Sequence, residues 1–135
     1  MQAVHDTVSW TASVCTGSLV LGAAGILAGV EATTHWAAMD ELAATGAQPV
    51  EARVVERGRI VTAAGVSAGI DMALTLAARL AGDTVAQAIQ LGIEYDPQPP
   101  FDAGSPSKAP AAVVALLRER RAGRASSDKA APSLA

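Results

Sequence analysis

The alternation of apolar and polar positions divides the first third of the chain into short strands and small-residue helices. Val8–Val14 is rich in β-branched residues and precedes an apolar, alanine- and glycine-rich run. This pattern predicts a buried strand that leads into a helix over Gly17–Ala28. A short β-like segment over Glu31–Thr34 and a helix over Trp36–Thr45 follow. Two successive strand–helix units are therefore expected.

The middle of the chain predicts a hairpin followed by a strongly amphipathic helix. Val50–Glu56 and Arg59–Thr62 flank a turn at Gly58, and their charged residues share one face. The small residues of Ala63–Gly69 predict a turn, and Ile70–Ala81 has apolar residues at the spacing of a helix that faces a core.

The last third predicts two helices on either side of an extended connection. Thr84–Ile93 and Lys108–Arg121 read as helices, and Pro97–Pro106 is rich in proline. Strands that alternate with helices indicate an α/β fold with a partly parallel sheet. We expect one folded domain over residues 1–121 and a small, polar, disordered tail over residues 122–135.

The most apolar strand, Val8–Val14, is expected in the middle of the sheet, where both of its faces and both of its edges are covered. Because this strand lies so near the first residue, we expect several βα units to precede it in a complete fold of this class. An uncovered strand edge and uncovered apolar helix faces would favour a homodimer or a larger oligomer.

Composition narrows the classes of function. The chain has 135 residues, half of them apolar, and a net charge of only -3, so charge gives no reason to expect nucleic acid or an anionic membrane as a partner. One cysteine excludes an intrachain disulfide and fits a reducing, cytoplasmic setting. The uncharged stretch Ser13–Val30 reaches the lower limit for a membrane span, but its glycines and hydroxyl residues favour a strand and a buried helix.

The single cysteine of the chain is the strongest candidate for a catalytic residue. Cys15 falls between the predicted strand and the predicted helix, so its sulfur is held at a strand-to-helix turn beside helix N–H groups that favour thiolate. Thr16 and Gly17 complete the turn, and their main-chain N–H groups are candidate oxyanion donors. This arrangement predicts a nucleophile elbow. The alternative is a buried, inert cysteine, which is the commoner state of a lone thiol.

Four segments together resemble the ThiJ/PfpI superfamily, within the class I glutamine-amidotransferase-like fold. They cover roughly residues 8–120. These segments are Ser13-Val14-Cys15-Thr16-Gly17-Ser18-Leu19-Val20-Leu21, Ala32-Thr33-Thr34-His35-Trp36, Ala64-Gly65-Val66-Ser67-Ala68-Gly69-Ile70-Asp71 and Ala86-Gln87-Ala88-Ile89-Gln90-Leu91-Gly92-Ile93-Glu94-Tyr95-Asp96-Pro97. The combination is similar to the branch that contains isonitrile hydratases and the sensor-like domains of some transcriptional regulators.

The resemblance implies a flavodoxin-like three-layer α/β/α sandwich, usually dimeric, of which about 90 N-terminal residues are not in this chain. It also implies a hydro-lyase in which the cysteine attacks the terminal carbon of R–N≡C and an N-substituted formamide is released. The cysteine and the following threonine of the family map onto Cys15 and Thr16, whereas an acidic residue at the end of the family's first strand has no counterpart here. The alternative function is a non-catalytic or redox-sensing module in which Cys15 is oxidised.

Two further residues have both a functional and a structural interpretation. His35 is a candidate base or orienting group for Cys15, or a histidine bonded to local backbone or to Asp40. Asp71 is a candidate acid that orients His35, or a carboxylate that complements the dipole at a helix start, which the position favours. One cysteine and two histidines without regular spacing predict no metal site, and no cofactor is expected. The expected partner is a small-molecule substrate.

Overall fold

The computed structural model describes residues 1–130, with side chains described as far as Gly123. One compact unit covers Met1–Asp96, and a second unit begins at Pro97. In chain order the elements are α1 (Gln2–His5), β1 (Thr11–Val14), α2 (Gly17–Ala23), β2 (Glu31–Ala32), the short 3-10 helix η1 (Trp36–Ala38), α3 (Met39–Ala44), β3 (Gln48–Pro49), β4 (Val54–Arg57), β5 (Ile60–Ala63), α4 (Val66–Ala81), α5 (Asp83–Gly92) and α6 (Ala111–Ala130).

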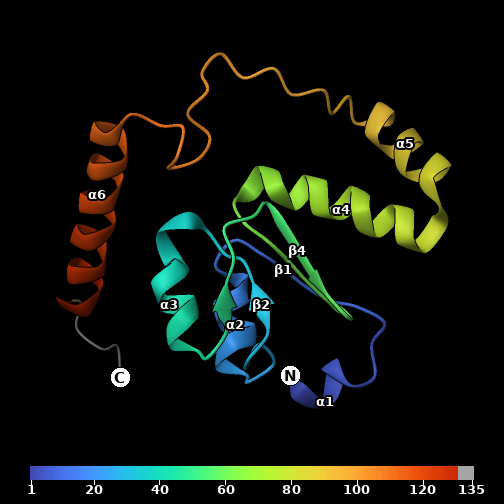
Figure 1. Cartoon of the computed structure of the whole chain (residues 1–135), viewed down its shortest axis with the longest axis horizontal. Coiled ribbons are helices and arrows are strands. Elements are labelled where there is room, and N and C mark those ends of the chain that lie inside the picture. The colour runs from blue at the N-terminus through green and yellow to red at the C-terminus, as the bar shows by residue number, and fades with distance from the viewer. Residues whose placement is uncertain (131–135) are drawn as a thin grey trace. The chain divides into compact units, whose positions relative to one another are not determined.

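The first unit contains a mixed sheet with the order β1-β5-β4 (Figure 1). β1 runs parallel to β5, and β4 forms the predicted antiparallel hairpin with β5. A second, parallel pair joins β2 to β3, a strand that the sequence did not predict. The α/β class and the partly parallel sheet are confirmed. Within the described residues, however, β5 rather than β1 is the middle strand.

The strand β5 is buried on both faces, and its alternating side chains divide the core in two. Ile60 contacts one apolar cluster, which includes Leu27 and Leu42 from the region of α2 and α3. Val61 and Ala63 belong to a second cluster with residues of α4. Figure 1 shows α4 on one side of the strands and α2 with α3 on the other. Helices therefore cover both faces, as a three-layer sandwich requires.

The helix α4 begins four residues before the predicted Ile70, because the glycine-bearing segment is its first turn rather than a loop. Gly65 precedes the helix in an extended conformation. Gly69 lies against β1 so closely that a Cβ atom there would approach Val14 Cγ1 to 2.9 Å. The glycine permits close contact between helix and strand, which the sequence pattern presented as a turn signal.

Other boundaries differ from the prediction by a few residues. β1 begins at Thr11 instead of Val8. α2 ends at Ala23 instead of Ala28, because Gly25 adopts a φ of 76° and ends the regular helix. The predicted helix over Trp36–Thr45 is divided into η1 and α3.

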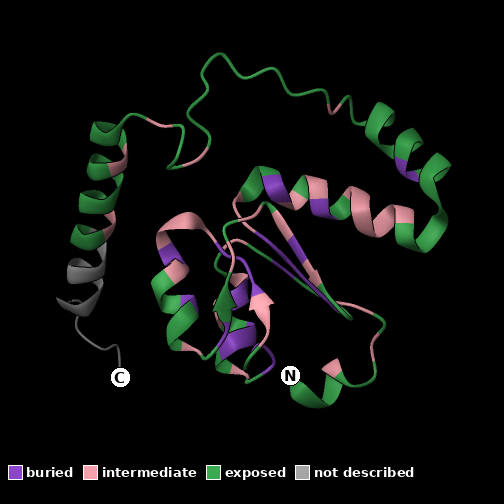
Figure 2. Ribbon diagram, in the orientation of Figure 1, coloured by how far each residue is buried: buried purple, intermediate pink, exposed green. Residues whose placement is uncertain are grey.

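The burial pattern separates the sheet region from the last helices (Figure 2). Buried residues gather on the strands and on the helices that cover them, whereas Ala86 is the buried residue of α5. Large apolar side chains of α4 and α5 remain in solvent, with Leu80 at 72% and Leu91 at 81% exposed. Self-association of these apolar faces stays a prediction.

The second unit consists of the proline-rich connection and α6. Lys108 Nζ lies 2.8 Å from Asp102 Oδ1 in the connection. The backbone of α6 is helical over Ala111–Ala130, nine residues beyond the predicted end at Arg121. Of the predicted disordered tail over residues 122–135, residues 131–135 lie outside the described residues. Among the helices described, none has both the length and the apolar composition that crossing a membrane requires.

Candidate functional site

Cys15 occupies a sharp turn between a strand and a helix, as the sequence predicted. It follows β1 directly, and α2 begins two residues later at Gly17. Its φ of 58° is positive, which non-glycine residues rarely adopt and which is often kept at functional sites. The thiol is free and half-buried. The turn therefore has the backbone conformation expected of a nucleophile elbow.

Both main-chain groups of Cys15 are fixed by hydrogen bonds. Its N–H donates to the carbonyl of Ala63 at the end of β5, at 3.0 Å. Its carbonyl oxygen accepts from Ser18 Oγ at 3.2 Å and from Thr34 Oγ1 at 2.9 Å. Three separate segments thus hold this one residue in place.

Main-chain N–H groups are available as hydrogen-bond donors at the start of α2, just after the cysteine. Thr16 is exposed, and its hydroxyl does not cap the helix. Among residues 1–130, no main-chain acceptor is assigned to its N–H. The sharp turn lies at Cys15, so Gly17 is not needed for it. A Cβ atom on Gly17 would meet Ser13 Cβ at an ordinary contact distance of 3.5 Å.

His35 lies next to Thr34 and is bonded to local backbone. Its Nδ1 accepts from the N–H of Ala37 at 3.2 Å and so caps η1. Its ring lies 5.5 Å from that of Trp36, centroid to centroid. The Thr34 hydrogen bond brings this segment against the elbow. The local-backbone interpretation is observed, and a role for His35 toward the thiol stays a prediction.

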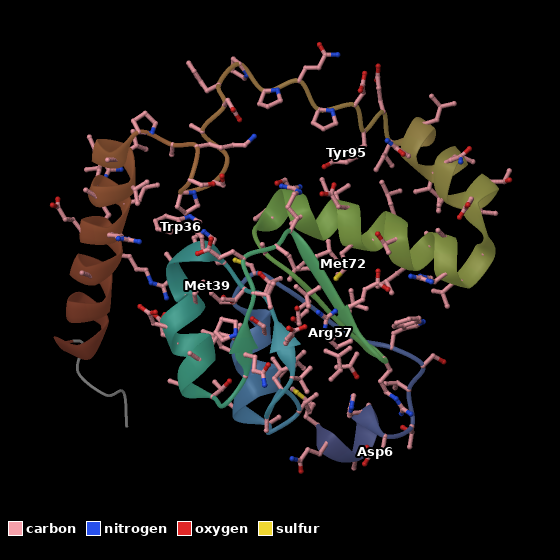
Figure 3. All side chains as sticks on the ribbon, viewed as in Figure 1. Asp6, Trp36, Met39, Arg57, Met72 and Tyr95 are labelled. Atoms are coloured by element: carbon pink, nitrogen blue, oxygen red, sulfur yellow. The ribbon has the colours of Figure 1, made fainter. Side chains whose placement is uncertain are left out.

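Asp71 belongs to a polar cluster on the surface of α4. Arg53 Nε donates to its Oδ2 at 2.6 Å, and the Tyr95 hydroxyl donates to its Oδ1 at 2.8 Å. The Arg53 guanidinium also contacts Ser67 Oγ at 3.3 Å. Figure 3 shows Tyr95 beside α4, with Met72 of that helix directed toward the strands. We call Arg53, Ser67, Asp71 and Tyr95 the Arg53 cluster.

The cluster alters the acidities of its members. Partial burial raises the pKa of Asp71, but hydrogen bonds from Arg53 and Tyr95 outweigh it and leave the pKa below its ordinary 3.8. The hydrogen bond to Asp71 raises the pKa of Arg53 and that of Tyr95. Both carboxylate oxygens are engaged, so an orienting role of Asp71 on His35 gains no support from these contacts. Nor does Asp71 begin a helix, because the first turn of α4 holds no acidic residue.

Threonine hydroxyls form a second polar group, which lies beneath the elbow. The N–H of Thr33 donates to Thr62 Oγ1 at 2.8 Å, and Thr33 Oγ1 donates to the carbonyl of Ala52 at 3.0 Å. Thr33, Thr34 and Thr62 are each at most 1% exposed. We call these three residues the threonine layer. Its hydrogen bonds connect the segment after β2 to three places: to β5, to Ala52 just before β4, and to Cys15.

Local sequence pattern does not indicate that these three threonines share a layer. Thr33 and Thr34 interrupt an apolar neighbourhood directly after a short strand, and paired hydroxyl residues at such a place signal buried polar groups that need partners. Nor does the sequence alone indicate that Arg53 and Tyr95 share a partner. No group of three or more histidine, cysteine or acidic residues in the described part of the chain is arranged to hold a metal ion.

A model of the DJ-1/PfpI family matches residues 1–79. The chain belongs to the DJ-1/PfpI family. Isonitrile hydratase from Pseudomonas putida is 58% identical over 113 residues, which are 84% of this chain and 50% of that protein. The match extends the family relationship beyond the elbow to the region of α5.

Solved structures agree with this assignment. A THiJ/PfpI family protein from Pseudomonas syringae is 51% identical, with a TM-score of 0.81 over 84% of this chain and 47% of that one. A DJ-1 superfamily protein from Salmonella typhimurium is 31% identical, with a TM-score of 0.60 over 70% of this chain and 52% of that one. The flavodoxin-like fold is therefore shown. The chain spans about half the length of the isonitrile hydratase that it matches.

Proposed function

We propose that this chain is the cysteine-bearing part of an isonitrile hydratase, a hydro-lyase that adds water to R–N≡C. The observation that carries the proposal is the 58% identity to the Pseudomonas putida isonitrile hydratase. The positive φ of Cys15 and the half-exposed free thiol support a nucleophile at this position. The partner is a small-molecule isonitrile.

The proposed reaction proceeds in two stages on the sulfur of Cys15. The thiol adds to the terminal carbon of the isonitrile: a C–S bond forms and the thiol proton reaches the same carbon, which gives a thioimidate, R–N=CH–S. Water then adds across the C=N bond. The tetrahedral adduct loses the sulfur, so that R–NH–CHO leaves and the thiol is regenerated. The sum is R–N≡C plus water, which gives an N-substituted formamide.

The neighbouring residues have distinct expected roles. The N–H groups of Thr16 and Gly17 would donate to the oxygen that forms in the tetrahedral adduct, and the Thr16 hydroxyl would polarise the substrate. His35 would transfer protons between sulfur, carbon and water. Asp71 would not contact the reacting groups, because its two oxygens are bonded to Arg53 and Tyr95. A homodimer or oligomer in a reducing cytoplasm is the proposed state of the protein, in line with its single cysteine and exposed apolar helix faces.

The test is hydration of a small alkyl isonitrile by the purified chain, with the formamide followed by proton NMR. The Cys15→Ala variant should lose the activity, by roughly a thousandfold or more, because no other thiol is present. Intact-mass spectrometry of the wild type should show an adduct that adds one isonitrile to the chain. An equal rate in both proteins would contradict the proposal. A wild type that forms no adduct but is readily oxidised at Cys15 would favour the redox-sensing alternative.

A further inference from the structure

The carbonyl oxygen of Cys15 is held by two hydroxyl groups that come from different parts of the fold. Ser18 is one turn further along the chain, whereas Thr34 is 19 residues away and follows β2. Both side chains are almost completely buried, with Ser18 at 0% and Thr34 at 1% exposed. Because a buried hydroxyl without a partner is costly, these two bonds satisfy both hydroxyls within the folded turn.

This carbonyl shares its peptide group with the N–H of Thr16. The peptide group is planar, and the chain contains no cis peptide bond among the described residues, so the two bonds point in opposite directions. Hydroxyl donors that fix the C=O direction from the buried side therefore fix the N–H direction on the other side. Because the Thr34 hydroxyl lies on the carbonyl side of this trans peptide group, the Thr16 N–H is directed away from Thr34.

The same contacts affect how strongly this N–H donates. A carbonyl that accepts two hydrogen bonds polarises its peptide group, and the effect increases the donor strength of the attached N–H. The N–H of Cys15 itself is bonded to the Ala63 carbonyl, so the residue is held from its other side as well. The turn cannot rotate to aim the Thr16 N–H elsewhere without breaking buried hydrogen bonds.

We propose that Thr34 is a positioning residue whose hydroxyl aims and polarises the Thr16 N–H as an oxyanion donor beside Cys15. The inference rests on the proposed function of this site, and it assigns to a residue of the β2–η1 segment a role at the elbow. Ser18 would contribute in the same way, but as a neighbour in the chain it adds less to the orientation of the turn.

The test compares Thr34→Val, which removes the hydroxyl, with Thr34→Ser, which retains it. Thr33→Val is the matched control, since Thr33 is equally buried and also donates its hydroxyl to a distant carbonyl, that of Ala52. Each protein is assayed for isonitrile hydration and for alkylation of Cys15 by iodoacetamide. Alkylation is a direct displacement that creates no oxyanion, so it reports on the access and ionisation of the thiol and not on the stabilisation of an oxyanion.

Thr34→Val should hydrate isonitrile about 10-fold more slowly through a lower kcat, because loss of a direct oxyanion donor costs about a hundredfold or more and this loss is indirect. Its alkylation rate should stay within about twofold of wild type, and Thr34→Ser should recover hydration. Equal losses of hydration in Thr34→Val and Thr33→Val would overturn the inference. So would a parallel loss of alkylation in Thr34→Val, which would indicate a general structural role.

An NMR measurement separates this inference from the proposed function, because it needs no activity. In labelled protein, Thr34→Val should shift the Cys15 carbonyl carbon and the Thr16 amide proton to higher field, and Thr34→Ser should return both toward wild type. Thr33→Val should leave these two signals in place. A protein that hydrates no isonitrile but shows these shifts would retain the positioning role. Unchanged shifts in Thr34→Val would overturn it even if hydration is confirmed.

Discussion

The threonine layer and the Arg53 cluster both join segments that are distant in the sequence, yet they differ in burial and in charge. The threonine layer is neutral and at most 1% exposed. In the Arg53 cluster the side chain of Arg53 is 56% exposed and that of Asp71 is 33% exposed. Since an unpaired polar group costs most where water is absent, the neutral hydroxyls should matter more to the fold than the ion pair.

The two groups also lie at different points relative to the candidate site. Thr34 contacts the carbonyl of Cys15 directly. The Arg53 cluster instead joins the start of the hairpin to α4 and to Tyr95, beyond α5. Charged residues are easier to recognise in a sequence, but it is the uncharged threonine layer that contacts Cys15.

Thr62→Val should be the most destabilising of these changes. The valine has nearly the same shape but leaves the buried N–H of Thr33 without its acceptor. An unsatisfied buried donor costs about 1–3 kcal/mol in the free energy of unfolding, which urea titration followed by circular dichroism would measure.

Thr75→Val is the matched control for this change. The Thr75 hydroxyl donates at 2.9 Å to the Asp71 carbonyl one turn back in α4, so its removal leaves only a carbonyl within a regular helix. We expect the free energy of unfolding to change by no more than about 0.5 kcal/mol. If Thr62→Val were no more destabilising than Thr75→Val, the threonine layer would lose its importance to the fold.

Gly69→Ala should have an intermediate effect, because it tests close packing rather than a hydrogen bond. The added methyl group would approach Val14 Cγ1 to 2.9 Å, next to the elbow. Overpacking costs about 1–3 kcal/mol, and the better helix propensity of alanine offsets about 0.5–1 kcal/mol of that. We expect a net loss of roughly 1 kcal/mol in thermal or urea unfolding.

Gly92→Ala provides the comparison for Gly69. Gly92 also lies in a helix, but no atom lies within 4 Å of a Cβ built there. The alanine should leave the free energy of unfolding unchanged or raise it by up to about 1 kcal/mol. A stabilised Gly69→Ala protein would show that Val14 yields readily and that the helix–strand contact is not tight.

The sequence predicted the parts of this fold that depend on local pattern. The hairpin, α4 and the turn at Cys15 follow from strand alternation, helical spacing and the change from one to the other. Family motifs then identified the sandwich. The predicted start of α4 was wrong. In the sequence Gly69 resembles a turn residue, and only the fold shows that it permits the close contact of the helix with Val14.

The rest of the candidate site depends on contacts between distant residues. Nothing local indicates that Thr34 bonds to Cys15, or that Asp71 has Arg53 and Tyr95 as partners. Local pattern placed Asp71 at a helix start, whereas in the structure it lies beyond the first turn. Residue type reveals which groups need partners, but only the fold selects the partner.

Asp71→Asn should have the smallest effect and should depend on pH. The native pKa of Asp71 lies below its ordinary 3.8. The contribution of the carboxylate is therefore complete above the unfolded value and is lost as pH falls through the native value. At pH 7 the half-exposed pair with Arg53 contributes about 0.2–1 kcal/mol, which salt reduces. The difference from wild type should vanish in acid, where both proteins carry an uncharged side chain.

Asp102→Asn is the control for this exposed pair. Asp102 is 79% exposed and has Lys108 as its partner, so its substitution should change the free energy of unfolding less than that of Asp71. Urea titrations from pH 7 down to the most acidic pH at which both proteins fold, each at low and high salt, would measure both variants. A loss in Asp71→Asn above about 2 kcal/mol at pH 7 would exceed what an exposed pair supplies. The ranking of the two regions would then reverse, and the Arg53 cluster would need a role beyond a surface contact.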